Sequence, residues 1–149
     1  MLRAARQQKQ TVAAKRAWTV VVFSVGGLKL AARTEDVGGV SPWDQQIPVP
    51  SRTPFVNSLI RQEKAVLPVY DLASRLTRSL KGATRLCLMA RHVDGPMAIC
   101  IDEDIPTLHT IEASRIRPTS GLDIATFGSF DHDGSDVAIV ALDRLGKQL

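Results

Sequence analysis

The side chains best suited to acid–base or metal chemistry are three histidines, His92, His109 and His132. Imidazole transfers protons near neutral pH and is a frequent ligand of zinc and copper. The three histidines lie in different turn-like segments, and none belongs to an H-E-x-x-H, G-x-S-x-G or glycine-rich phosphate motif. The sequence therefore predicts no catalytic residue and no histidine metal site.

Two acidic stretches could bind a cation. The stretch "DHDG" at residues 131–134 resembles part of a calcium loop, but it lacks the further ligands and the terminal acid of an EF-hand. We interpret it as a polar hairpin turn. The stretch "DEDIP" at residues 102–106 offers three carboxylates. We interpret it as a solvated acidic edge, with a weak metal site or a contact for a basic partner as the alternative.

Cys87 and Cys100 lie in apolar segments, and their spacing matches neither a zinc site nor a redox motif. We therefore expect two reduced thiols in the core of a cytosolic protein. No apolar run approaches the roughly 20 residues of a membrane-spanning helix, and the N-terminus lacks the apolar stretch of a signal peptide. The sequence thus predicts no cofactor, no metal and no membrane insertion.

The net charge of +4 is concentrated in the N-terminal segment. Residues 1–17 hold five basic and no acidic side chains, whereas the remaining 132 residues hold 14 basic and 15 acidic ones. We expect this segment to be a basic tail that frays or forms a transient helix, and that acts as a solubilising leader. Contact with phosphate or anionic lipid is the alternative. Because the body is nearly neutral and the chain is only 5% aromatic, a nucleic-acid-binding barrel is disfavoured.

Deletion of residues 1–16 should leave the melting temperature of the remaining chain nearly unchanged, because this segment has no apolar face to dock. Thermal denaturation followed by circular dichroism would measure the effect. A loss of several degrees would show that the tail packs as part of the domain, and the boundary between residues 17 and 18 would be wrong.

From Trp18 onward, short strand-like runs alternate with turn signals. "WTVVVFSV" and "LKLAAR" flank Gly26–Gly27, a hairpin signal. "TRLCLMARH" and "PMAICID" flank "VDGP", and "ATFGSF" and "DVAIVALDRL" flank "DHDG". The absence of a long helical period favours an all-β fold of small barrels or a sandwich over alternating βαβ units. The predicted core comprises Phe23, Val25, Leu67, Val69, Leu86, Leu88, Ile99, Ile101, Ile139 and Val140.

Two stretches have mixed signals. "TPFVNSLIR" at residues 53–61 is predicted to form a short helical turn, with Thr53 as the N-cap and Pro54 at the first helical position. "AVLPVYDLASRL" at residues 65–76 reads as a strand despite Pro68, which cannot donate a ladder hydrogen bond. Proline is tolerated where the strand is unpaired on one side or bulged. We expect Asp71 to cap a short helix after the strand.

The order of these elements resembles the CheW-like domain of bacterial chemosensory systems. Members show F-x-[LV]-G at the first hairpin, then a valine, and later a V-P-x-x-D-L strand and helix; here these are Phe23 to Gly26, Val37 and Leu67 to Leu72. "AICIDEDIPTLHTIEASRIRP" and "DVAIVALDRL" resemble the family's later strands. The resemblance covers residues 18–146, so we expect a tail at 1–17 and a CheW-like domain at 18–149.

The resemblance implies two SH3-like five-stranded β-barrels packed around a shared core, with short helical turns. It also implies a non-enzymatic adaptor that links the cytoplasmic tip of methyl-accepting chemoreceptors to the regulatory domain of a CheA-type histidine kinase. We would place such a protein in the cytoplasm, recruited to membrane-associated receptor arrays. By this resemblance, the partner-binding residues are Val37, Gly39, Ser58, Arg61, Glu63, Lys64, Leu86, Cys87, Asp104 and Thr107.

The chain departs from the family pattern just before the proline-containing strand. The family has N-L-R-G there, whereas this chain has "RQEK" at residues 61–64, so the family arginine falls on Glu63 and the family glycine on Lys64. A reversed charge alters the match with a partner. We interpret the chain as a divergent adaptor. The alternatives are drift on a surface loop, or a degenerate array-integration or pilus-motility scaffold module that does not bridge receptor and kinase.

Overall fold

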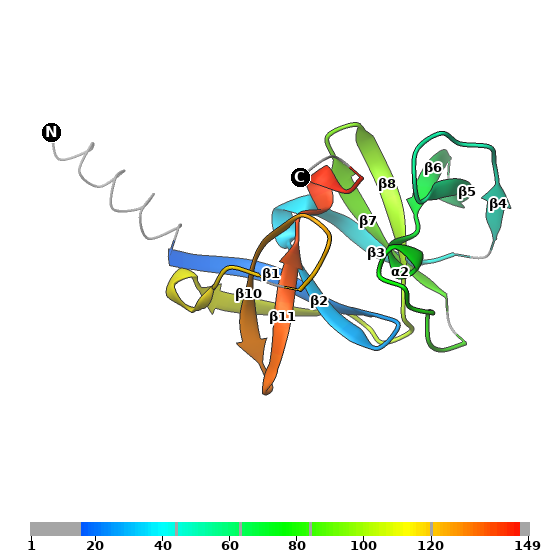
Figure 1. The fold of residues 1–149 in the computed structure, drawn as a ribbon. Helices are drawn as coiled ribbons and strands as arrows, with labels where there is room; N and C mark the ends of the chain where they lie inside the picture. Colours follow the sequence, from blue (N-terminus) through cyan, green and yellow to red (C-terminus); the bar gives the residue numbers. More distant parts are fainter. Residues whose placement is uncertain (1–15, 44, 63, 84, 120, 147–149) are drawn as a thin grey trace, which may run out of the picture.

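The computed structural model describes residues 16–43, 45–62, 64–83, 85–119 and 121–146, and these form two β-sheets (Figure 1). Sheet one has the order β10-β11-β2-β1-β9. Its strands are β1 (Ala17–Val25), β2 (Leu28–Arg33), β9 (Thr107–Glu112), β10 (Thr126–His132) and β11 (Ser135–Val140). Of the predicted tail, only Arg16 and Ala17 are among the described residues, and Ala17 already belongs to β1.

Sheet two has the order β3-β7-β8-β6-β5-β4. Its strands are β3 (Val37–Pro42), β4 (Gln46–Pro48), β5 (Val56–Gln62), β6 (Ala65–Tyr70), β7 (Leu86–His92) and β8 (Gly95–Ile101). The all-β class with two SH3-like subdomains is confirmed, and we call them barrel one (sheet one) and barrel two (sheet two). Sheet two has six strands rather than five, because the short β4 adds to its edge.

The apolar side chains form three clusters, because strands in both sheets bury both of their faces. In β1, Val21, Phe23 and Val25 join a shared core between the sheets, whereas Val20 and Val22 fill barrel one. This two-sided burial explains why "WTVVVFSV" is continuously apolar rather than alternating. All ten predicted core residues are buried except Leu86, which is half-buried against the shared core.

Strand β6 accommodates Pro68 because its pairing is one-sided at that point. Pro68 lies opposite Leu59 of β5, while the pairing of β6 with β8 begins only at Val69. The proline therefore interrupts no ladder on the β8 side. The predicted cap is confirmed: Ser74 donates its backbone N–H to Asp71 Oδ1 at 3.1 Å, at the start of α2 (Leu72–Arg75).

The predicted helical turn at residues 53–61 is wrong. The chain makes a tight turn in which Val56 N–H donates to Thr53 O at 3.2 Å, and then continues as strand β5. Ser58 and Ile60 face the interior of barrel two, a spacing of two that is typical of a strand. Pairing along β6 outweighs the local helix-start signal of Thr53 and Pro54.

The predicted acidic edge at residues 102–106 is only partly solvated, because Asp102 is 2% exposed. Its Oδ1 accepts from Gly26 N at 2.9 Å and from Lys81 N at 2.8 Å, and its Oδ2 accepts from Gly27 N at 2.8 Å. One carboxylate thus joins the β1–β2 hairpin, the α2–β7 connection and the end of β8. Glu103 and Asp104 are exposed, as expected.

Gly26 is required at this junction because its backbone has a positive φ angle and because a side chain would not fit there. Its φ is +59°, and an added Cβ would lie 2.5 Å from Arg78 Cβ. The closeness of the α2–β7 connection to the hairpin allows Asp102 to reach backbone donors from both.

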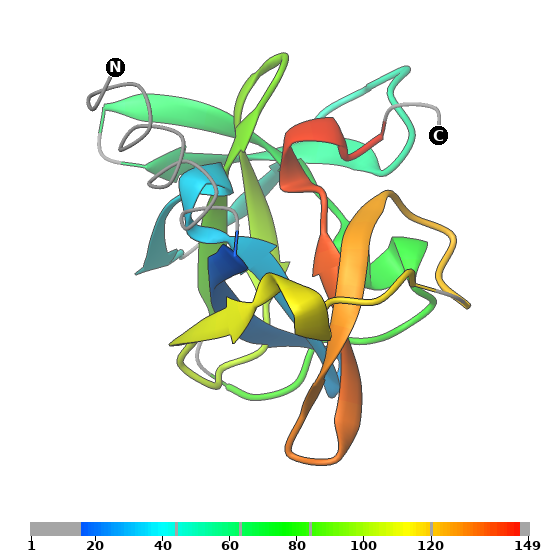
Figure 2. The same ribbon diagram turned by 90° about the vertical axis from the view of Figure 1, so that its left-hand side faces the viewer.

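The C-terminal 3₁₀ turn η3 (Leu142–Arg144) follows β11 of barrel one and packs against the tip of the β7–β8 hairpin of barrel two (Figure 2). Val93 N–H donates to Asp143 O at 3.1 Å. His92 is buried there: its Nδ1 accepts from Asp94 N at 3.0 Å, which leaves Nε2 as the donor to Leu145 O at 2.7 Å. His92 is thus a satisfied core residue.

Candidate protein-binding surface

One edge strand of each sheet, β3 in sheet two and β9 in sheet one, carries apolar side chains on the face that continues the shared core. On β3, Val40 lies opposite Leu88 of the shared core, and it is 40% exposed. On β9, Leu108 lies opposite Val21 of the shared core, and it is 68% exposed. The turn η1 (Thr34–Asp36) contacts both β1 and β3, which brings the two facing sheets together near the start of β3.

We call Val37, Val40, Leu86 and Leu108 the shared-core margin. Val37 and Leu86 are half-buried and pack against the shared core, whereas Val40 and Leu108 reach solvent. Apolar side chains that extend a core to the surface are typical of protein–protein contact sites. The margin is therefore the candidate partner surface, and it contains two residues predicted from the sequence, Val37 and Leu86.

Gly39 lies beside this margin at a β-bulge. The β3–β7 register shifts between Val37 and Gly39, and Gly39 has a φ of +150°. The extra residue puts Val37 and Val40, three positions apart, on the same face. An added Cβ at Gly39 would meet no atom within 4 Å, so the backbone rather than crowding accounts for the glycine.

Two predicted contact residues, Cys87 and Ser58, do not present their side chains to a partner. Cys87 lies opposite Ser41 and belongs to the interior of barrel two, with its Sγ 3.7 Å from Ser41 Oγ. Ser58 is buried opposite Val69, which belongs to the same interior. Successive side chains of a strand point to opposite faces, and both of these lie on the face toward the interior of barrel two. They could affect partner binding only indirectly, by packing inside barrel two and so supporting the residues at its surface.

The β5–β6 hairpin carries the next predicted group. Arg61 and Lys64 are exposed at its tip, while Glu63 lies outside the described residues. Gln62 Nε2 donates to Ser41 Oγ at 2.6 Å, which holds this hairpin against β3. The structure thus brings the hairpin and the β3–β7 ladder together.

Asp104 and Thr107 come from the connection into sheet one and from the first residue of β9, and both are exposed. Thr107 lies opposite Val22, on the barrel-one face of β9, whereas Leu108 lies on the shared-core face. Leu108, and not the predicted Thr107, is therefore the β9 residue on the face of the shared-core margin.

The two cysteines are free and buried, as predicted. They lie directly opposite each other on β7 and β8, and Gln46 Nε2 donates to Cys100 Sγ at 3.1 Å. Burial raises the pKa of the Cys87 thiol and raises that of Cys100 to about 12. Both thiols are therefore neutral at physiological pH and are poor nucleophiles or metal ligands.

The fold brings two histidines together that are far apart in the sequence. The rings of His109 on β9 and His132 on β10 meet edge to face with centroids 4.6 Å apart, and Thr107 Oγ1 lies 2.8 Å from His109 Nε2. Sequence spacing could not reveal this pair, because it arises where the two edge strands of sheet one approach. Within the described residues, no three or more His, Cys, Asp or Glu side chains form a group that could hold a metal ion.

Comparisons with known proteins agree with this architecture. The model of the CheW-like domain family matches residues 19–148. The chain is similar in structure to the scaffolding protein TtCheW from Thermoanaerobacter tengcongensis, with a TM-score of 0.71, 19% sequence identity, and coverage of 89% of this chain and 97% of that one. No curated protein was found to match it. Among the described residues, no helix is long and apolar enough to cross a membrane. Because the family match spans both barrels, the chain belongs to the CheW-like domain family.

Proposed function

We propose that this protein is a non-enzymatic chemosensory adaptor that couples chemoreceptors to a CheA-type histidine kinase. The observation that carries the proposal is the family match over residues 19–148, which includes both barrels and the core between them. The protein would work in the cytoplasm, recruited to membrane-associated receptor arrays. Its partners would be the receptor's cytoplasmic tip and the kinase's regulatory domain.

The chemistry of the described residues supports a binding role rather than catalysis. The buried thiols are neutral, His92 has both ring nitrogens hydrogen-bonded, and Asp102 accepts three backbone hydrogen bonds. The exposed apolar residues of the shared-core margin offer a surface of the kind that partner proteins cover.

The second candidate is a degenerate array-integration or pilus-motility scaffold that does not bridge receptor and kinase. The departure "RQEK" at residues 61–64 favours it, because a change of charge at a contact loop can abolish one partner while the other is kept. A pulldown that scores binding of a receptor cytoplasmic fragment and of a kinase regulatory domain separately distinguishes the two. Binding of both supports the adaptor; binding of the kinase domain alone supports the scaffold.

The double variant Glu63→Arg, Lys64→Gly should restore the family pattern in this loop. We expect roughly tenfold weaker binding to this protein's own receptor and stronger binding to a receptor that serves an ordinary family member, because reversing a contact charge costs more than losing a rim charge. Calorimetric titration at low salt, where screening is weakest, measures the difference.

A charge-matched control is Glu112→Gln at the exposed end of β9, which changes the net charge by the same amount and should alter neither affinity. The melting temperature of the double variant should stay close to wild type, since Lys64 is exposed and surface substitutions usually change stability little. If both receptor affinities are unchanged at low salt, the loop has merely drifted, and the proposed receptor specificity fails.

A further inference from the structure

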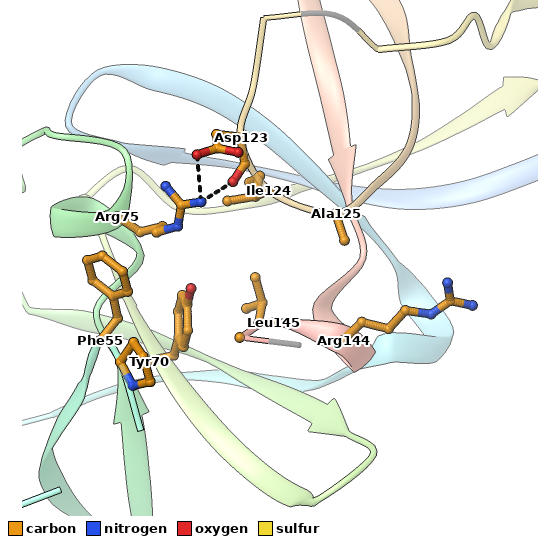
Figure 3. Close-up of a pocket in the computed structure, with 10 residues that line it drawn as sticks. Phe55, Tyr70, Arg75, Asp123, Ile124, Ala125, Arg144 and Leu145 are labelled. Carbon is orange, nitrogen blue, oxygen red and sulfur yellow. Dashed lines mark hydrogen bonds and ion pairs between the residues drawn. The ribbon is translucent and has the colours of Figure 1, made fainter. Parts of the chain in front are cut away.

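A pocket of about 280 Å³ opens where α2 of barrel two faces the C-terminal end of barrel one (Figure 3). Its floor is apolar and buried, and it is formed by Tyr70, Ile124 and Leu145. Its rim carries Phe55 and Arg75 on one side and Asp123 on the other. None of the residues of the shared-core margin lines this pocket.

Phe55 is a large aromatic residue with an unfavourable backbone conformation and a partly exposed side chain. Its φ is +63°, a left-handed conformation that is costly for a bulky side chain, and it is 37% exposed. The conformation is held by its neighbours, since Asp71 N–H donates to Phe55 O at 2.7 Å. The strained backbone of Phe55 does not lead to full burial of its side chain, and strain of this kind is characteristic of functional positions.

The ring of Phe55 forms one wall of an aromatic and cationic corner. Its centroid is 6.1 Å from that of Tyr70, and the Arg75 guanidinium carbon is 5.6 Å from it. The two rings are tilted by 47°, and the separations suit aromatic and cation–π contacts, so a third ring can contact the same residues.

Arg75 supplies the polar part of the site. Its Nη2 lies 3.0 Å from Asp123 Oδ2 and also donates to the Asp123 carbonyl oxygen, so it spans the two barrels across the pocket mouth. The Asp123 side chain is 86% exposed, so an incoming carboxylate can replace it on the guanidinium at little cost. The charged residues of the lining are Arg75, Arg144 and Asp123, which leaves the rim net positive.

We propose that this pocket binds a short segment of a protein partner through an aromatic side chain with an adjacent carboxylate. The ring would lie against Phe55 and Tyr70, and the carboxylate would take the place of Asp123 on Arg75. The volume of about 280 Å³ is at the lower limit of small-molecule sites, which fits one ring rather than a cofactor. Because the pocket shares no residue with the shared-core margin, the site would add a second docking point to the adaptor.

Phenylacetate is the smallest probe with both groups, and it can be titrated into ¹⁵N-labelled full-length protein by NMR. We expect a Kd on the order of 1–10 mM, with shifts at the amides of Tyr70, Ala125 and Gly146. Benzyl alcohol, which has the ring but no carboxylate, should bind about tenfold more weakly, and acetate should leave these amides unshifted. The blocked peptide Gly-Ser-Phe-Asp-Ser-Gly should shift the same amides, and its Asn analogue, which keeps the ring, should bind about tenfold more weakly.

Variants separate the two parts of the site. Arg75→Gln should abolish the preference for phenylacetate over benzyl alcohol while binding of the ring remains, and Phe55→Ala should abolish both. Val66→Ala, an exposed apolar residue of β6 outside the pocket, is the matched control and should bind like wild type. The amide spectrum of each variant reports its folding. The proposal is overturned if phenylacetate shifts are absent or scattered, or if they persist in Phe55→Ala.

Discussion

Replacement of Asp102 by alanine should lower the melting temperature by on the order of 10 °C. The change leaves the backbone N–H groups of Gly26, Gly27 and Lys81 without their acceptor in a largely buried junction. Unsatisfied buried donors cost about 1–3 kcal/mol each, and about 1 kcal/mol shifts the melting temperature by ~2–4 °C in a domain of this size. Differential scanning calorimetry measures the loss directly.

Asp104→Ala provides the matched control, because it removes the same side chain two positions away from an exposed site. It should melt within about 1–2 °C of wild type. Asp102→Asn should fall between the two, since the amide keeps one acceptor oxygen but presents an NH₂ group to a backbone donor. If Asp102→Ala melts with the Asp104 control, the carboxylate does not hold the junction together.

Ile101→Ala should destabilise the protein by about 2–5 kcal/mol, through lost burial and the cavity that remains. Ile101 is buried in the shared core. Leu67→Ala should cost a similar amount, although Leu67 lies inside barrel two. Because β7 and β8 contribute to both clusters, both variants should still unfold in one transition, which urea denaturation followed by fluorescence and by circular dichroism can check.

The control for this pair is Ile105→Ala, the same substitution at a side chain that is 82% exposed. It should change the stability by less than about 0.5 kcal/mol. Melting of both core variants within a degree or two of that control would contradict the packing of barrels around a shared core.

Local signals were sufficient to predict most strands. The hairpins at Gly26–Gly27 and at the "DHDG" turn are confirmed, because Gly26, Gly27, Asp133 and Gly134 adopt the positive φ angles that tight hairpin turns require. Strand β5 could not be predicted, because Thr53 and Pro54 give a local helix-start signal. The pairing of β5 with β6, which outweighs that signal, depends on the tertiary structure. The burial of Asp102 could not be predicted from local signals, because two of its three donors lie more than seventy residues away in sequence.

The candidate site was predicted at the level of strands rather than side chains. Resemblance located β3, β7 and the β5–β6 hairpin, but it could not tell which residues face outward. Bulges between Val37 and Gly39 and between Val56 and Ser58 each shift the register by one residue, and such a shift exchanges the two faces of a strand. Cys87 and Ser58 both face the interior of barrel two, and the resemblance alone does not reveal this orientation. The register itself identifies Val40 and Leu108.

The order of the strands has a consequence for how the chain is made. Barrel two is encoded as one uninterrupted stretch, β3 to β8, whereas barrel one receives β1 and β2 before that stretch and β9, β10 and β11 after it. During synthesis from the N-terminus, the inserted barrel is complete while the outer barrel still lacks three strands. The β1–β2 hairpin must wait for partners such as Ala138, which pairs with Leu30 across most of the chain. Until then, the shared-core face of barrel two is the folded surface against which that hairpin can pack.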